Sequence, residues 1–427
     1  MDKYFVKSFF VYGGTAGASR ILPILMLPIY LASLGPDAYG KVEIIFSFFQ
    51  FALIFGLLQL ETALQRLYFK VGNRSALFYS LLTGVMASSL FVFIGCYIFS
   101  EALALLFFDS VEERQAIVVA AMSILFANIA TICMVFLRFM DKPIDFILIT
   151  VGQVVLTIGF TYFYLIMLEY GVLGYFLGLF LGWFFAAVVS FCRVTKNIKF
   201  SFDFSFINSA FAFAIPQLPA RLASFFIQYG NRFFVLYLLG AQAVGLMGLS
   251  LKFAALFQLL LLAFSMAWNP FLYKNEKSIS CQADINKIFL FLLICLTVFH
   301  VVTVFLSSLI IEQFFTEDYW AASQYVALAI VPIQLLIIKE VVESGVKLSN
   351  KTQYISYAYL FSVLVTIICM FFSKTIDGIL LSAIVGSLVL VILSWYFSER
   401  NFYLKYNKFY FLIYCICISL TFLYENK

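Results

Sequence analysis

Long apolar runs without polar interruption recur along the whole chain, and they restrict its fold more than any other feature. Of the 427 residues, 64% are hydrophobic and only 11% are charged, whereas roughly half of a soluble domain is apolar and about a quarter is charged. In lipid every backbone polar group must be bonded internally, which leaves α-helices and closed β-barrels. Barrel strands alternate apolar and polar residues over about 10 positions. Because these runs do not alternate, the sequence predicts an all-α integral membrane protein.

The apolar runs divide the chain into about twelve predicted transmembrane helices, each of the length that an α-helix needs to cross the hydrocarbon core. The predicted spans are 9–33, 42–60, 76–99, 115–138, 144–168, 172–193, 209–239, 243–268, 286–310, 322–345, 353–372 and 376–397. A further apolar segment, 409–424, is at the low end of spanning length. Its sequence allows either a thirteenth span or a helix in the membrane interface.

Charged residues lie mainly in the loops, and their sign alternates from one loop to the next. With Lys3 and Lys7 taken as cytoplasmic, basic residues gather in every second loop and acidic residues in the others. An excess of lysine and arginine is typical of cytoplasmic loops. The pattern predicts a multi-pass protein with a cytoplasmic N-terminus. It also accounts for the net charge of +5 without a nucleic-acid partner.

A short repeat indicates a duplicated architecture. The segment LGPDAYG at 34–40 joins the first two predicted spans, and LGAQAVG at 239–245 joins the seventh and eighth. Leucine, both glycines and one alanine match. The same offset pairs the Leu-Tyr dipeptide at 67–68 with the one at 272–273. Because six spans separate the copies, both halves insert with the same polarity, as in transporters with parallel repeats.

The repeat predicts the domain organisation. We expect two parallel six-helix lobes, 1–198 and 199–400, followed by an additional apolar segment at 401–427. Transporters built in this way bind their substrate near the bilayer midplane, where the repeats meet.

The N-terminal region resembles a known family of membrane transporters. Pro23 and Pro28 lie in the first predicted span, and LGPDAYG follows it. In this pattern the chain is similar to polysaccharide-export flippases of the O-antigen (Wzx) type, within the multidrug/oligosaccharidyl-lipid/polysaccharide exporter superfamily. Chain length, span number, duplication and a cytoplasmic N-terminus agree with that family. The additional C-terminal segment departs from a twelve-span member.

The resemblance implies a MATE-like pair of lobes that work by alternating access in the bacterial inner membrane. Proteins of this type flip an undecaprenyl-pyrophosphate-linked oligosaccharide, an O-antigen or capsule repeat unit, from the cytoplasmic to the periplasmic leaflet. They work beside a polysaccharide polymerase and a chain-length regulator. The resemblance leaves the sugar and the coupling ion, H⁺ or Na⁺, open.

The seventh predicted span carries the most polar residues. Gln217, Arg221, Ser224, Gln228 and Arg232 recur at helical spacing, so one regular helix over 209–239 would place all five on one face. An ionisable residue at bilayer depth costs at least roughly 2.5–3.5 kcal/mol on insertion scales. We therefore expect this stripe to face a cavity or a polar helix. The alternative for Arg232 is that it snorkels to the membrane surface.

The sign of the intramembrane charge points to an anionic ligand. Arginine matches phosphate oxygens with a planar fork of donors, which suits a pyrophosphate. The residues we expect to bind substrate are Arg20, Arg221, Arg232, Lys252, Gln217, Gln228 and Gln50. A multidrug cation exporter of the same superfamily would instead need buried carboxylates, and the sequence places none securely in mid-span.

Three further residues are candidates for coupling or gating. Glu61 follows the second predicted span and either pairs with a basic residue or touches substrate. Lys339 has Glu343 four positions on, which is the spacing of a simple helical ion pair. His300, the one histidine in the sequence, is either a packed polar group or a proton carrier.

No motif for catalysis, metal binding or cofactor binding is found, so we expect a transporter without cofactor rather than an enzyme. The first alternative is an ion-coupled multidrug or metabolite antiporter of the same fold. The second is a membrane-embedded polysaccharide polymerase. A polymerase needs a large external loop, and the longest predicted outer loop, near 100–114, is short.

Overall fold

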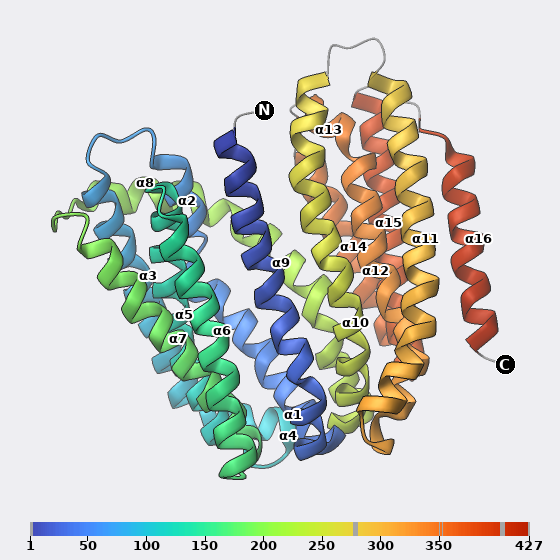
Figure 1. Cartoon of the computed structure of the whole chain (residues 1–427), viewed down its shortest axis with the longest axis horizontal. Helices are drawn as coiled ribbons and strands as arrows, with labels where there is room; N and C mark the ends of the chain where they lie inside the picture. Colours follow the sequence, from blue (N-terminus) through green and yellow to red (C-terminus); the bar gives the residue numbers. More distant parts are fainter. Residues whose placement is uncertain (1–2, 276–280, 350, 352, 402–405, 426–427) are drawn as a thin grey trace. The chain divides into compact units, whose positions relative to one another are not determined.

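The computed structural model describes residues 3–275, 281–349, 351, 353–401 and 406–425 (Figure 1). Their side chains are described except those of 3–21, 220, 262–263, 266–267, 269–271, 273–275, 281–284, 420 and 422–425. In the described ranges the regular structure is helical and contains no strand. The chain separates into two compact units, Met1–Phe225 (unit 1) and Phe226–Lys427 (unit 2). The predicted lobe boundary at 198/199 stays a prediction.

Unit 1 is a bundle in which α5 and α7 pack together, with α6 against α7 and α3 against α5. Its elements are α1 (Lys3–Leu57), α2 (Leu60–Leu67), α3 (Arg74–Ile98), α4 (Ser100–Phe108), α5 (Arg114–Phe139), α6 (Pro143–Tyr162), the π-turn η1 (Phe163–Met167), α7 (Gly171–Thr195), α8 (Phe204–Ala214), the 3₁₀ turn η2 (Ile215–Gln217) and α9 (Leu218–Phe225).

Unit 2 is a second bundle, in which α12 packs against α10 and α15, and α14 against α15. Its elements are the π-turn η3 (Phe226–Gly230), α10 (Asn231–Asn275), α11 (Cys281–Phe314), the 3₁₀ helix η4 (Glu317–Tyr325), α12 (Val326–Val342), α13 (Ser344–Leu348), α14 (Gln353–Phe371), α15 (Ile376–Asn401) and α16 (Lys408–Glu425).

Among the described residues, 10 helices are long and apolar enough to cross a membrane. Two of them are unusually long, Leu22–Leu57 with 36 residues and Arg221–Leu261 with 41. Each contains one glycine with a non-helical backbone, so each covers two of the predicted spans. The predicted all-α membrane fold is confirmed.

The two interrupting glycines are the equivalent positions of the sequence repeat. Gly35 has φ 68° and ψ 167°, and Gly240 has φ 83° and ψ 177°. This combination of positive φ and extended ψ is open essentially only to glycine. A Cβ at either position would meet no atom within 4 Å, so the backbone angle rather than crowding requires glycine. Both copies of the motif therefore adopt the same local turn.

Small residues allow the helices to approach closely, as is typical in lipid. In unit 1, a Cβ on Gly178 or Gly182 of α7 would overlap Thr161 or Thr157 of α6. In unit 2, the hydroxyl of Ser362 on α14 donates to the carbonyl of Gly386 on α15 at 2.7 Å. Hydroxyl groups thus lie against glycine backbone where helices meet.

The prediction of one regular helix over 209–239 is wrong. The stretch is divided into α8, the 3₁₀ turn η2, α9, the π-turn η3 and the start of α10. Pro216 and Pro219 lack the amide hydrogen that a continuous helix needs; Pro216 is the middle residue of the 3₁₀ turn and Pro219 is the second residue of α9. Tight and wide turns change the angular spacing of side chains, so the five polar residues do not form the regular stripe that a straight helix would give.

The C-terminal apolar segment is a helix packed against α11 and α12 of unit 2 (Figure 1). The hydroxyl of Tyr414 on α16 donates to Gln334 Oε1 on α12 at 2.9 Å. Thr421 Oγ1 lies 3.2 Å from His300 Nε2 on α11. Polar contacts of this kind hold helices together in lipid, so α16 is an integral part of unit 2.

Candidate functional site

The junction between α1 and α2 is an irregular turn that places the first candidate residue, Glu61. Leu58 and Gln59 both have positive φ, 49° and 59°, so α1 ends and α2 begins at a new angle. For residues other than glycine this conformation costs roughly 1–2 kcal/mol each. The last turn of α1 is supported from α3, because Ser88 and Ser89 donate to the carbonyl of Gly56 at 2.6 and 3.1 Å.

Glu61 lies in the first turn of α2, within electrostatic reach of Arg221 on α9. Burial raises the pKa of the Glu61 carboxyl above its usual value, and the backbone amides of the helix start and the charge of Arg221 only partly offset this. Glu61 Oε2 is buried and has no hydrogen-bond partner among the described residues. The structure thus brings two sequence candidates together in unit 1.

Arg221 itself is exposed on α9. The helix that carries it packs against α1, where the rings of Phe51 and Phe225 lie 5.2 Å apart. Gln217, at the end of η2, is half-buried and donates to the carbonyl of Phe213 at 3.0 Å. Arg221 is therefore held on a packed helix with its side chain accessible.

Arg232 has a different environment in unit 2. Arg232 is only 6% exposed, and its guanidinium donates to the carbonyl of Gln228 at 3.0 Å. The same guanidinium lies 5.1 Å from the centre of the Tyr229 ring. The side chain folds back on the π-turn that precedes it. Substrate binding by Arg232, and the alternative that it snorkels to the membrane surface, both stay predictions.

The remaining candidates are spread over several helices. Gln50 is half-buried on the second part of α1, Lys252 is half-buried on α10, and Gln228 is exposed in η3. Arg20 lies in α1, and its side chain is outside the described residues.

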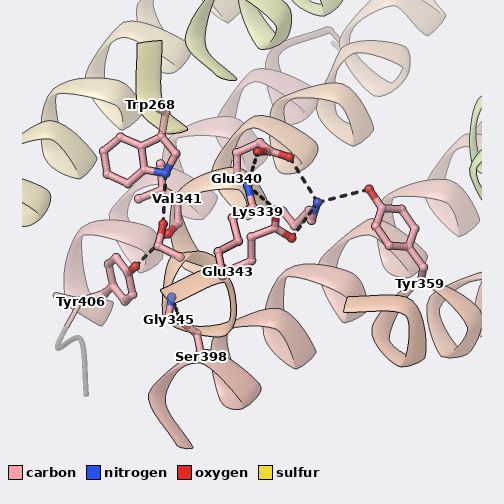
Figure 2. A network of polar contacts seen from close by, with 11 residues as sticks. Trp268, Lys339, Glu340, Val341, Glu343, Gly345, Tyr359, Ser398 and Tyr406 are labelled. Carbon is pink, nitrogen blue, oxygen red and sulfur yellow. Dashed lines mark hydrogen bonds and ion pairs between the residues drawn. The ribbon is translucent and has the colours of Figure 1, made fainter. Parts of the chain in front are cut away.

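Lys339 belongs to a compact ion cluster in unit 2 (Figure 2). Its Nζ lies 2.8 Å from Glu343 Oε2 and 3.3 Å from Glu340 Oε1, and it donates to the Tyr359 hydroxyl at 3.3 Å. Lys347 completes the cluster with contacts of 2.8 Å to Glu340 and 2.9 Å to Glu343. Two cations and two carboxylates therefore neutralise one another.

The cluster occupies the junction between α12 and α13 and is largely withdrawn from solvent. The side chains of Lys339 and Glu343 are 5% and 2% exposed. For Lys347, burial alone would lower the pKa, but the charges of Glu343 and Glu340 outweigh burial and raise it. The helical pair expected between Lys339 and Glu343 is confirmed, as part of a larger network.

His300 is fully buried in α11. Its Nε2 contacts Thr421, and its neighbour Gln334 donates to the carbonyl of Leu296 at 3.0 Å. Gln334 also accepts from Tyr414. His300 therefore lies in the polar contacts that attach α16, as the interpretation of a packed polar group expects.

Sequence reasoning missed two features of the charged residues. Glu340 and Lys347 close the ion cluster, although the spacing of 339, 343 and 347 at four-residue steps was available as a signal. Glu43 is 2% exposed inside the candidate span Leu22–Leu57 and accepts a hydrogen bond from Tyr39 at 2.8 Å. It is a buried carboxylate two turns after the Gly35 turn.

Within the described part of the chain, no group of three or more histidine, cysteine, aspartate or glutamate side chains could hold a metal ion. The chemistry that the candidates offer is the binding of anions by arginine and lysine, with nearby carboxylates that adjust the net charge.

The fold is that of a multi-pass membrane transporter. A structure of the lipid II flippase MurJ in an inward closed conformation is similar, with a TM-score of 0.73, 18% identity and coverage of 96% of this chain and 97% of that chain. An inward-facing multidrug resistance MATE family transporter of the MOP superfamily has a TM-score of 0.69 and 14% identity, with coverage of 90% and 94%. Both define the MATE-like fold of this chain.

The sequence places the chain more narrowly. It belongs to the polysaccharide biosynthesis protein family, whose pattern it matches over residues 5–276. A Haemophilus influenzae protein of the Lsg locus is 24% identical over 291 residues, which are 65% of this chain and 69% of the relative. The family resemblance seen in the N-terminal motif is confirmed.

Proposed function

We propose that the protein flips an undecaprenyl-pyrophosphate-linked oligosaccharide, an O-antigen or capsule repeat unit, from the cytoplasmic to the periplasmic leaflet of the bacterial inner membrane. Membership of the polysaccharide biosynthesis family and the fold shared with a lipid II flippase support a lipid-linked substrate. The observation that carries the proposal is Arg221, an exposed arginine on α9 within an apolar stretch of the chain. A guanidinium binds pyrophosphate oxygens bidentately.

The transport step is alternating access, with the lipid tail kept in the bilayer and the headgroup held by basic side chains. Arg221 is the central group, and Arg20, Lys252, Gln50, Gln217 and Gln228 contribute further charge and hydrogen bonds to phosphate and sugar. In this proposal Arg232 shapes the turn that carries Gln228, because its guanidinium is already bonded there. Neither a reaction nor a cofactor is needed for this cycle.

Glu61 supplies a route for coupling to protons. With the carboxyl ionised, its charge offsets that of Arg221; with the carboxyl protonated, the arginine offers its full charge to an anion. The raised pKa of Glu61 brings this change closer to physiological pH. Lys339 and His300 then act as the fixed polar contacts of unit 2 rather than as the coupling groups. A polymerase and a chain-length regulator remain the proposed partners.

The proposal is tested by locating the lipid-linked oligosaccharide in cells that lack the protein. We expect it to accumulate on the cytoplasmic face and to be restored to the outer face by the wild type but not by Arg221→Ala. The matched control is Arg193→Ala, since Arg193 is also an exposed arginine of unit 1 and pairs with Asp145 at 3.3 Å. Membrane immunoblots check that both variants are present in equal amounts. If Arg221→Ala restores transport as well as Arg193→Ala, the cationic site is refuted.

A second candidate function is an ion-coupled multidrug or metabolite antiporter. The buried carboxylate Glu43, bonded to Tyr39 in a candidate span, favours it, because a cation binds to such a group. Normal export of the oligosaccharide in the deleted strain, together with new drug sensitivity, would establish the antiporter. Repeat units that reach the periplasm but stay unpolymerised would instead indicate a polymerase.

A further inference from the structure

Unit 1 has a cleft of about 840 Å³ at the end where α3 finishes and α5 and α7 begin. We name it the α3–α5–α7 cleft. The charge pattern of the loops predicts that this end faces away from the cytoplasm. Its volume is within the range of sites that hold small organic ligands, about 300–1,000 Å³. Among the described residues of unit 1, its lining does not include Glu61, Arg221, Gln50 or Gln217 of the proposed transport site.

The rim of the cleft carries charges of both signs. Glu101 lies in the first turn of α4, Glu112 precedes α5, and Arg114 is the first residue of α5. Arg114 lies 3.9 Å from Glu101, which is too long for a hydrogen bond, and the two side chains are 48% and 62% exposed. Its Nε is oriented by a hydrogen bond to Ser100 Oγ at 3.1 Å. These groups are therefore held near one another but remain accessible.

A neighbouring carboxylate is already occupied. Glu113 lies 3.3 Å from Lys41 and is 14% exposed. Burial raises its pKa, and the charge of Lys41 and the hydrogen bond from it partly offset the effect. Glu113 does not line the cleft, so the acidic groups open to a ligand there are Glu101 and Glu112.

The floor of the cleft is apolar. Val118 and Val119 lie one turn further along α5, and Leu173 and Leu177 lie in the first two turns of α7. All four are half-buried within candidate membrane spans. A polar rim at the span ends and an apolar floor below it form an amphipathic cleft at the level of the lipid headgroups. Free sugars and soluble metabolites do not match valine and leucine walls, whereas a lipid does.

We propose that the α3–α5–α7 cleft binds a zwitterionic phospholipid whose headgroup ends in a primary amine. The phosphate contacts Arg114, at the start of α5, where the helix dipole also favours an anion. The ammonium donates to Glu101 and Glu112, and the first part of the acyl chains lies on Val118, Val119, Leu173 and Leu177. An anionic headgroup would meet two carboxylates with one arginine. A trimethylammonium headgroup has no hydrogen to donate to them.

The test measures lipid binding to the purified, delipidated full-length protein by native mass spectrometry. The probes are phosphatidylethanolamine, phosphatidylcholine and phosphatidylglycerol with identical acyl chains. For the wild type we expect phosphatidylethanolamine to bind roughly tenfold more tightly than phosphatidylcholine, because charge-assisted hydrogen bonds are lost with the methylated amine. The double variant E101Q/E112Q should lose this preference. R114Q should weaken both lipids alike, since both have the phosphate.

Two control variants share the predicted side of the membrane but lie outside the cleft. Glu317 and Lys374 are exposed, so E317Q and K374Q should leave the lipid preference unchanged. A photoreactive amino acid in place of Val119 tests the location without altering any charge, and it should crosslink to phosphatidylethanolamine in membranes. Equal binding of the two zwitterionic lipids by the wild type, or a preference that survives E101Q/E112Q, would overturn the proposal. Recovery of a sugar-bearing lipid at position 119 would overturn it too.

Discussion

Replacing Lys339 by methionine should destabilise the protein by about 3–5 kcal/mol, the cost of breaking a buried ion pair. The Lys339 ammonium neutralises Glu343, which is 2% exposed, and also contacts Glu340. Without it, Lys347 must balance the two carboxylates alone, and their side chains are only 17% and 2% exposed. Methionine is similar in length to the aliphatic part of lysine, so the loss arises chiefly from the uncompensated charge rather than from a cavity.

The double variant K339M/E343Q separates charge from packing. It leaves Glu340 and Lys347, 2.8 Å apart, so that the cluster is again neutral. We therefore expect it to be more stable than K339M by about 1 kcal/mol or more, within the range of coupling energies between contacting residues. If the cluster contributed only through the packing of its aliphatic stems, the second substitution would add to the loss.

The free energy of unfolding is measured in detergent by reversible denaturant titration followed by tryptophan fluorescence. K408M is the control, because Lys408 pairs with Glu399 at 3.3 Å but is 72% exposed. An exposed pair of this kind contributes about 0–1 kcal/mol. The reasoning is refuted if K339M is no less stable than K408M, or if K339M/E343Q is less stable than K339M.

Three further predictions test separate parts of the structure. Gly35→Ala and Gly240→Ala should each cost about 1–3 kcal/mol of unfolding free energy, as expected for a side chain forced into a glycine-only backbone region. The control is Gly159→Ala in α6, which has open space and a helical backbone and should be neutral or slightly stabilising. Because the folded-state pKa of Glu61 is raised, the folded chain binds a proton more readily than the unfolded chain. Wild-type stability should therefore rise relative to Glu61→Gln as the pH falls from neutral toward the ordinary glutamate value, and a pH-independent difference would contradict this. Tyr414→Phe removes the hydrogen bond to Gln334 and should cost about 1–3 kcal/mol by leaving a buried amide oxygen short of a donor, which hydrogen exchange of α16 would report as earlier opening.

Much of the architecture followed from the sequence because lipid imposes one strong constraint. Apolar runs of spanning length must be helices, so the helical elements and their approximate limits were predictable. The matched glycines Gly35 and Gly240 indicated the two turns that divide the longest helices, since essentially only glycine tolerates that backbone conformation. The ion pair of Lys339 and Glu343 was also predictable, because side chains four residues apart are neighbours on a helix.

Contacts that depend on tertiary structure were not predictable from spacing. The charge of Arg221 acts on Glu61, which follows the irregular turn at Leu58 and Gln59, and no sequence signal marks two non-glycine residues with positive φ. The regular polar stripe predicted for the seventh span is not formed, because the spacing of residues in a sequence indicates a helix but does not distinguish α, 3₁₀ and π turns. Pro216 and Pro219 were the sequence signal that a regular helix could not continue through this stretch.

The intramembrane cations differ in how much of their charge remains available, and this difference orders the candidates for substrate binding. Lys339 lies within 3.3 Å of Glu340 and Glu343, and Lys347 pairs with the same two carboxylates, so the cluster carries no net charge. Arg232 uses its guanidinium on the backbone of Gln228 and the Tyr229 ring. Arg221 is exposed, and burial raises the pKa of the Glu61 carboxyl on which its charge acts. An anionic headgroup binds most strongly where the protein's own compensation is weakest, which is why Arg221 rather than a more deeply buried cation is the first residue to substitute.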